Sequence, residues 1–339
     1  MTAKSFVHKA LSKKKIDKNF KISVILTLCF VLACCAVYVI KNKSYSKDVI
    51  LHKANTHYIK EQYFMAAKYF DKAISLGAEG SEIFRNYAIA LLKLGNYDSA
   101  IKNLKLSEEI DPYNAETYYS LGNAYYQKAY ASNNSDQFIQ GIKYLEKAIN
   151  LSPAMEKAYI LIGLSYRNCG MQENARSWYR RALLASNFSK AGFYNLIGHT
   201  FREEERYKEA ADYYQRAIDN DYSFAAAYCN LGDMYLKMND KDTAMLKYKK
   251  SIAVGPDYIV PYIKIGQIYY DDAYFDDAVF WALQAFRINP DSDKANYLLG
   301  MAYKEIGRKI DAVEYLKKAA YCGSDDAVYE LKNIGIDLR

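Results

Sequence analysis

The sequence predicts an all-α protein in which one N-terminal transmembrane helix precedes an α-solenoid of about eight helical hairpins. Two observations predict this fold class. Aromatic, aliphatic and small residues recur with a period of about 34 residues between positions 47 and 326, and such a period is typical of stacked helical repeats. Before them, residues 22–40 form a run of 19 residues without a charged side chain.

The N-terminal segment differs in composition from the rest of the chain. A basic tail, residues 1–21, precedes the apolar run 22–40, and a linker, residues 41–46, follows it. The run has no polar face, and its length is about that needed to cross the hydrocarbon core of a bilayer. We therefore expect a transmembrane signal anchor at 22–40.

Lysine asymmetry predicts the orientation of this anchor. Seven lysines precede the run and five follow it within twenty residues, and cytoplasmic flanks carry the excess of Lys and Arg. We expect a single-pass membrane protein with a cytoplasmic N-terminus and its repeats on the exterior or periplasmic side. The opposite orientation, with the repeats facing the cytosol, stays open.

A second interpretation of the same run concerns processing. Val31-Leu32-Ala33-Cys34 is similar to a bacterial lipobox, which would make Cys34 a lipidation site. Apolar residues continue to Ile40, and the basic region before the run is long, so we prefer the uncleaved anchor. Both interpretations attach the chain to a membrane by its N-terminus.

The positive charge of the chain belongs to the N-terminal segment. The whole chain carries +7; residues 1–46 hold nine lysines and one aspartate, or +8, which leaves −1 for the remaining 37 basic and 38 acidic residues. A nucleic-acid-binding domain needs a basic stripe on its folded part. We therefore expect no nucleic-acid partner.

The segment 225–258 shows the repeated pattern clearly. Its first half places Tyr228, Gly232 and Tyr235 on one helix face, because their spacing is four and three. Its second half places Ala244 and Tyr248 on another helix face and ends at a Gly-Pro pair, where a helix stops. Neither helix can bury its apolar face alone, so the pair needs copies of itself.

Copies of this pattern follow one another directly between positions 47 and 326. The third copy is seven residues longer than 34, which predicts either a widened loop or two helices each lengthened by a turn. After the last copy, residues 327–339 predict a capping segment, with a short helix from about Asp325 to Asn333. The predicted repeats are 47–80, 81–114, 115–155, 156–190, 191–224, 225–258, 259–292 and 293–326.

This pattern resembles the tetratricopeptide repeat family. The resemblance covers most of the chain and implies a right-handed solenoid, here attached to a membrane. Glycines inside helices cost about 1 kcal/mol each relative to alanine, and they are expected where a partner helix packs closely. We interpret them, and the repeated tyrosines, as packing residues. These glycines are Gly122, Gly163, Gly198, Gly232, Gly266 and Gly300.

The resemblance also implies a binding groove, because the first helix of each pair lines a concave surface in this family. Asparagine can bond a peptide backbone as donor and acceptor, and arginine can bind a carboxylate with two hydrogen bonds. We therefore expect a protein or peptide partner with some acidic character. The predicted groove residues are Arg85, Tyr119, Asn123, Tyr126, Lys157, Arg167, Asn195, His199, Arg202, Asp233, Gln267, Tyr270 and Lys304.

The carboxylate clamp with which some relatives hold chaperone C-termini is absent from the sequence. It requires a lysine four residues before an asparagine in one first helix, and Asn123 is preceded there by Tyr119. Nor does the chain contain a phosphate-binding loop, a nucleophile elbow or a zinc motif. We expect no cofactor, no metal ion and no catalytic residue.

The sequence thus predicts a non-catalytic, membrane-anchored scaffold that holds a partner in its groove, in envelope assembly or secretion. One alternative is a regulatory or substrate-recruiting subunit of a separate enzyme complex. Another is a cytosol-facing docking or import receptor. The oligomeric state does not follow from the sequence.

Overall fold

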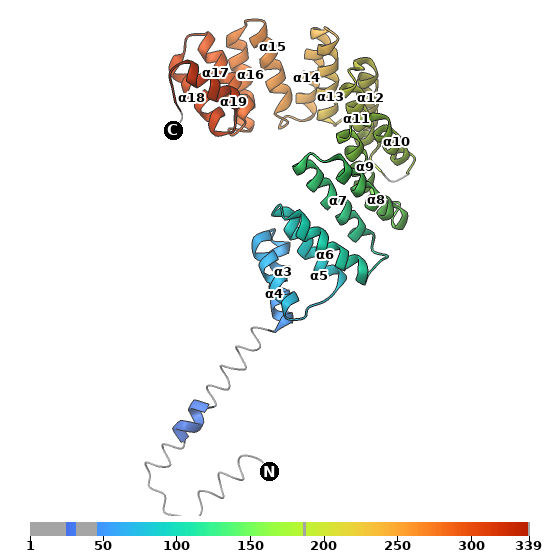
Figure 1. Ribbon diagram of the computed structural model, residues 1–339. Coiled ribbons are helices and arrows are strands. Elements are labelled where there is room, and N and C mark those ends of the chain that lie inside the picture. The colour runs from blue at the N-terminus through green and yellow to red at the C-terminus, as the bar shows by residue number, and fades with distance from the viewer. Residues whose placement is uncertain (1–24, 32–45, 186–187, 338–339) are drawn as a thin grey trace, which may run out of the picture. The chain divides into compact units, whose positions relative to one another are not determined.

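The computed structural model describes residues 25–31, 46–185 and 188–337, and these parts are helices joined by short turns (Figure 1). The chain divides into two compact units, residues 1–133 and 134–339. We call them the N-terminal unit and the C-terminal unit and describe each by itself. Together they give an all-helical, solenoid-like fold.

The predicted membrane span is not found. Of the apolar run 22–40, the structure describes residues 25–31, which are helical. No helix within the described ranges is long and apolar enough to cross a membrane.

This finding contradicts the predicted single-pass membrane localisation and leaves the transmembrane helix and signal anchor unsupported. The lysine argument ranked two orientations of an anchor, but it did not test whether an anchor exists. The other residues of the run, among them Cys34, lie outside the described residues, as do the tail 1–21 and most of the linker.

The N-terminal unit consists of five helices from Lys47 onward, which alternate as first and second members of hairpins. Each helix contacts the next one along the chain. Its core contains Phe70, Leu104 and Leu121, which are fully buried. The helices are α3 (Lys47–Ile59), α4 (Tyr63–Ser75), α5 (Ser81–Lys93), α6 (Tyr97–Ile110) and α7 (Ala115–Ser132).

The C-terminal unit continues the alternation. Its first helices are α9 (Glu156–Asn168), α11 (Lys190–Glu203), α13 (Ala225–Lys237), α15 (Val260–Asp271) and α17 (Asp293–Glu305). Its second helices are α10 (Gln172–Leu183), α12 (Tyr207–Asn220), α14 (Lys241–Val254), α16 (Phe275–Ile288) and α18 (Lys309–Tyr321). The unit begins with α8 (Ser135–Leu151) and ends with α19 (Asp325–Asn333), whose Ala327 and Leu331 pack against Leu316 and Ala319 of α18.

The seven extra residues of the third repeat lengthen its helices. α7 has 18 residues and α8 has 17, compared with 13 in α9. Two asparagines separate them: Asn133 adopts the left-handed conformation, at φ 50° and ψ 44°, and ends α7. The side chain of Asn134 accepts a hydrogen bond from the backbone N–H of Asp136 and so caps α8. The structure therefore has lengthened helices in place of a widened loop.

Candidate functional site

The residues predicted to line the middle of the groove come together in the C-terminal unit. We call their surface the first-helix face, and define it by Arg167 of α9, the α11 residues Asn195, His199, Arg202 and Glu203, Asn230 and Asp233 of α13, and Lys264 of α15. Apart from Arg202, the side chains of this face are linked to one another by hydrogen bonds and ion pairs, several of them across neighbouring first helices.

Three tyrosines of the second helices pack directly behind this face. Tyr179 of α10, Tyr214 of α12 and Tyr248 of α14 are fully buried. Each ring lies against a glycine of the first helix of its own pair. A Cβ atom added at Gly163, Gly198 or Gly232 would come within 2.1, 2.6 or 2.7 Å of the facing ring. The glycines are therefore required for the tyrosine rings to occupy these positions.

The hydroxyls of Tyr214 and Tyr248 reach polar side chains of the first-helix face. Tyr214 Oη lies 3.0 Å from His199 Nδ1, and Tyr248 Oη donates to Asp233 Oδ1 at 2.7 Å. His199 and Asp233 directly follow Gly198 and Gly232 in the sequence, so both hydroxyls emerge at the same repeat position. A buried hydroxyl requires such a partner.

A chain of hydrogen bonds crosses α13, α11 and α12. Asn230 Nδ2 donates to Asn195 Oδ1 at 2.8 Å, and Asn195 Nδ2 lies 3.2 Å from His199 Nε2. Because this amide nitrogen is a donor, His199 Nε2 accepts and His199 Nδ1 carries the hydrogen toward Tyr214. Burial, and then the charges of Arg202 and Arg167, lower the pKa of His199 to about 3. The imidazole is thus neutral at physiological pH.

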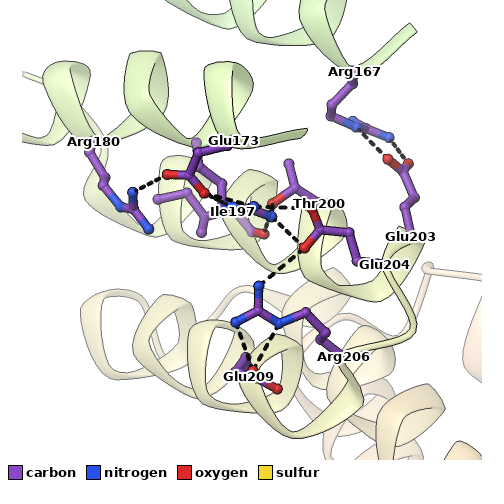
Figure 2. A network of polar contacts seen from close by, with 10 residues as sticks. Arg167, Glu173, Arg180, Ile197, Thr200, Glu203, Glu204, Arg206 and Glu209 are labelled. Carbon is purple, nitrogen blue, oxygen red and sulfur yellow. Dashed lines mark hydrogen bonds and ion pairs between the residues drawn. The ribbon is translucent and has the colours of Figure 1, made fainter. Parts of the chain in front are cut away.

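Two ion pairs lie on either side of this chain. The Arg167 guanidinium binds the Glu203 carboxylate with two hydrogen bonds, one of them at 3.2 Å from Nε to Oε2. Lys264 Nζ lies 3.1 Å from Asp233 Oδ1. Each pair joins one first helix to the next, and each neutralises the charges of both partners. Figure 2 shows the Arg167–Glu203 pair.

A second polar network lies at the α10–α11 contact and is centred on Arg176, which is 3% exposed. Its guanidinium donates to the two Glu204 carboxylate oxygens at 2.9 and 3.0 Å and to Glu173 at 2.8 Å. Arg206 also donates to Glu204, at 3.3 Å. Both guanidiniums lie over the Phe201 ring, at 4.5 and 4.6 Å from its centroid. This network joins neighbouring repeats (Figure 2).

Other predicted groove residues do not join the polar chain of the first-helix face. Gln267 donates to Asp271 of its own helix at 2.8 Å, Tyr270 packs against the Phe275 ring, and Lys304 pairs with Glu330 at 2.7 Å. Lys157 is exposed in the first turn of α9. Arg85 of α5 and Tyr119, Asn123 and Tyr126 of α7 belong to the N-terminal unit, where Asn123 accepts from Gln127 at 3.2 Å.

Sequence reasoning missed several residues of the site, namely Glu203, Asn230, Lys264 and the three tyrosines. One signal could have found the tyrosines. The other repeats have Phe70, Leu104, Leu145, Ala282 and Leu316 at the corresponding position, so the hydroxyl is present only at 179, 214 and 248. Because packing alone needs no hydroxyl, three in a row indicate polar partners on the facing helices.

The structure offers no metal centre in the part of the chain that it describes, since no group of three or more His, Cys, Asp or Glu side chains is placed to hold an ion there. Cys229 of α13 is buried among Tyr248 and Ile265. Burial, and then Asp233, raise the pKa of its thiol to about 12. The thiol is therefore protonated at physiological pH and is a poor nucleophile.

Two family models match this chain. One, described as TPR repeat, matches residues 88–128 and 198–239. The other, described as tetratricopeptide repeat, matches residues 122–155, 156–187, 225–258 and 293–321. This chain carries tetratricopeptide repeats. The resemblance to the tetratricopeptide repeat family is thereby confirmed, and proteins of this family are mostly non-catalytic scaffolds for protein–protein interactions.

Individual relatives are only distantly similar to this chain. Protein CTR9 homolog of Arabidopsis thaliana is 22% identical over 71% of this chain and 22% of its own length. Hsp70-Hsp90 organizing protein 1 of Glycine max is 22% identical over 71% of this chain and 41% of its own. Protein O-mannosyl-transferase TMTC3 of Homo sapiens is 19% identical over 80% of this chain and 35% of its own length. The chain spans less than half the length of each of these relatives.

A solved structure supports the fold alone. The C-terminal part of a TPR repeat-containing protein from Cytophaga hutchinsonii superposes with a TM-score of 0.52 at 16% sequence identity. The match covers 74% of this chain and 99% of that one.

Proposed function

We propose that this chain is a non-catalytic scaffold that binds a segment of a partner protein on its first-helix face. The observation that carries the proposal is the row of polar side chains on the first-helix face, two of which are held from behind by Tyr214 and Tyr248 in consecutive repeats. The scaffold role typical of the family supports it. The proposal concerns α9, α11, α13 and α15 of the C-terminal unit.

The hydrogen bonds behind the face favour binding. Tyr214 and Tyr248 restrict the rotamers of His199 and Asp233 before a partner arrives, so less side-chain entropy is lost on association. The two asparagines present neutral amide groups at a low desolvation cost compared with isolated charges. Such a surface is suited to the backbone and polar side chains of a bound segment.

Envelope assembly and secretion are not part of the proposal, because those settings depended on the membrane anchor. Recruitment of a substrate or regulator to a separate enzyme complex is one form of the same scaffold role. It would use the same surface and differ only in the identity of the partner.

Site-specific photo-crosslinking in the native cell tests the proposal. A photoreactive residue replaces Lys157 or Gln267, which are exposed on first helices, or Lys208 or Lys249, which are exposed on second helices as controls. We expect one discrete adduct at both first-helix positions and none at the controls. Equal labelling at all four positions, or labelling of the controls alone, would place partner binding elsewhere.

A further inference from the structure

The charges at the centre of the first-helix face do not cancel. Arg167 is neutralised by Glu203, and Lys264 is neutralised by Asp233. His199 is neutral and uses both ring nitrogens in hydrogen bonds to Asn195 and Tyr214. What remains is the positive charge of Arg202.

Arg202 lies among these groups. It follows His199 by three residues and Asn195 by seven, so the three side chains share one face of α11. Its charge acts on both His199 and the Tyr214 hydroxyl, and Asp233, Arg167 and Glu203 act on the same hydroxyl. The residue is half-buried. Within residues 46–185 and 188–337, its guanidinium has no ion-pair or hydrogen-bond partner.

A half-buried guanidinium without a counter-charge destabilises the folded chain, because it has lost part of its hydration and no ion pair replaces it. Its planar fork matches a carboxylate, which accepts two parallel hydrogen bonds. The matching arrangement already exists one helix away, where Arg167 binds Glu203 in this way. A carboxylate from the partner would complete a third ion pair between the two existing ones.

We propose that the bound protein segment places a single carboxylate, from Asp or Glu, on the Arg202 guanidinium. The inference rests on the proposed function and specifies the chemistry of the partner. The number of acidic groups follows from the surroundings. Among the residues that define the first-helix face, Arg202 is the one cation without a counter-charge, so a second acidic residue next to the first would find no unpaired cation there and would repel the bound carboxylate. The preferred segment therefore has one isolated acidic residue instead of an acidic run.

The first test uses the purified full-length chain and a displayed library of random short peptides. We expect captured peptides to be enriched in a single Asp or Glu and depleted in adjacent acidic pairs. The variant Arg202→Gln should lose this enrichment. The matched control is Arg216→Gln, which removes an exposed guanidinium over the Tyr213 ring of α12, and it should keep the enrichment.

A double-mutant cycle with one captured peptide measures the interaction free energy between Arg202 and the acidic residue of the peptide. Replacing its acidic residue by the corresponding amide should weaken binding to the wild-type chain about tenfold or more, as expected for a charge-assisted hydrogen bond. The same replacement should have little effect on binding to Arg202→Gln. Additive losses would overturn the proposal, because they would show that the carboxylate binds elsewhere. Thermal denaturation of each variant establishes that it is folded.

The outcomes separate this inference from the proposed function. If the wild-type chain captures no peptide, binding of a protein segment fails and the inference fails with it. If it captures peptides without a preference for an isolated acidic residue, the proposed function stands and only the role of Arg202 is wrong. Enrichment in acidic runs would also overturn the inference, since it would require more than one unpaired cation on the first-helix face.

Discussion

At the scale of single residues, glycine and tyrosine form a pair at three consecutive positions of the C-terminal unit. A glycine inside a helix costs about 1 kcal/mol relative to alanine, yet Gly163, Gly198 and Gly232 lie within helices. The cost is offset because each glycine admits a buried tyrosine ring. The rings of Tyr214 and Tyr248 in turn bring a hydroxyl to the first-helix face.

The variant Gly198→Ala should destabilise the protein by about 1–3 kcal/mol, the range for overpacking a closed core. Its Cβ would come within 2.6 Å of the Tyr214 ring, which has no space to retreat. Urea denaturation measures the change. Gly192→Ala is the matched control in the same helix, because a Cβ there meets no atom within 4 Å. It should stabilise by up to about 1 kcal/mol. Equal effects of the two variants would refute the packing account.

His199 should make stability depend on pH. Its pKa is about 3 in the folded chain and about 6.5 in the unfolded chain. Between these values the unfolded state binds a proton that the folded state does not, so stability falls as the pH falls below about 6.5. The loss approaches about 1.4 kcal/mol per pH unit for this one group.

Urea denaturation of the wild-type chain and of His199→Asn at several pH values between 7 and 5 checks this prediction. The wild-type chain should lose stability relative to the variant over that range. The NMR shift of the His199 Hε1 proton should stay constant over the same range. A titration midpoint near pH 6.5 in this chemical shift would contradict the prediction that the folded chain keeps His199 neutral and hydrogen-bonded.

At the scale of elements, three turns between paired helices hold an unfavourable residue, Glu61, Glu205 or Ala273, in the left-handed conformation. The α15–α16 turn places Ala273 at φ 62°, and the equivalent α17–α18 turn has Gly307 at φ 81°. Both turns make the same backbone hydrogen bonds, from Ala273 and Tyr274 and from Gly307 and Arg308. The left-handed conformation costs an alanine about 1–2 kcal/mol, and a glycine adopts it readily.

The variant Ala273→Gly should therefore stabilise the chain by about 0.5–1 kcal/mol, since relief of strain exceeds the entropy cost of the added glycine. The reciprocal variant Gly307→Ala should destabilise it by about 1 kcal/mol. Thermal melts of both variants measure these changes. A lower melting temperature for Ala273→Gly would show that the turn is not strained.

The Arg176 network should hold α10 against α11. Arg176→Met leaves Glu204 without its two strongest hydrogen bonds in a partly buried position, which should cost about 2 kcal/mol or more. Arg180→Met is the control: it removes a 46% exposed side chain that binds the same Glu173, and exposed ion pairs contribute about 0–1 kcal/mol. Hydrogen exchange should accelerate in α10 and α11 for Arg176→Met alone. Unchanged hydrogen-exchange protection of α10 and α11 would show that the network contributes little to holding these two helices together.

At the scale of the whole molecule, the C-terminal unit, residues 134–339, has its own hydrophobic clusters. Repeat proteins are stabilised by contacts between neighbouring repeats. A fragment of residues 134–339 should therefore fold alone. Circular dichroism should show a helical spectrum and a cooperative melt, and Gly198→Ala should lower its stability as in the full chain. A fragment without a cooperative transition would contradict the division into two units.

The sequence by itself determined the repeated helical hairpins, because the period of its apolar residues encodes packing faces that are local to each pair of helices. It also placed Arg167, Asn195, His199, Arg202 and Asp233 on first helices, since their positions follow from the same period. The predicted membrane localisation was wrong, because no helix within the described residues is long and apolar enough to cross a membrane. The prediction had rested on local hydrophobicity and flanking lysines alone.

Only the tertiary structure decided how the site is built. The bonds from Tyr214 to His199 and from Tyr248 to Asp233, and the ion pairs of Arg167 and Asp233, join different helices. Such contacts depend on the closeness and rotation of packed helices, which a one-dimensional period does not contain. For the same reason, the uncompensated charge of Arg202 became visible only once the partners of its neighbours were known.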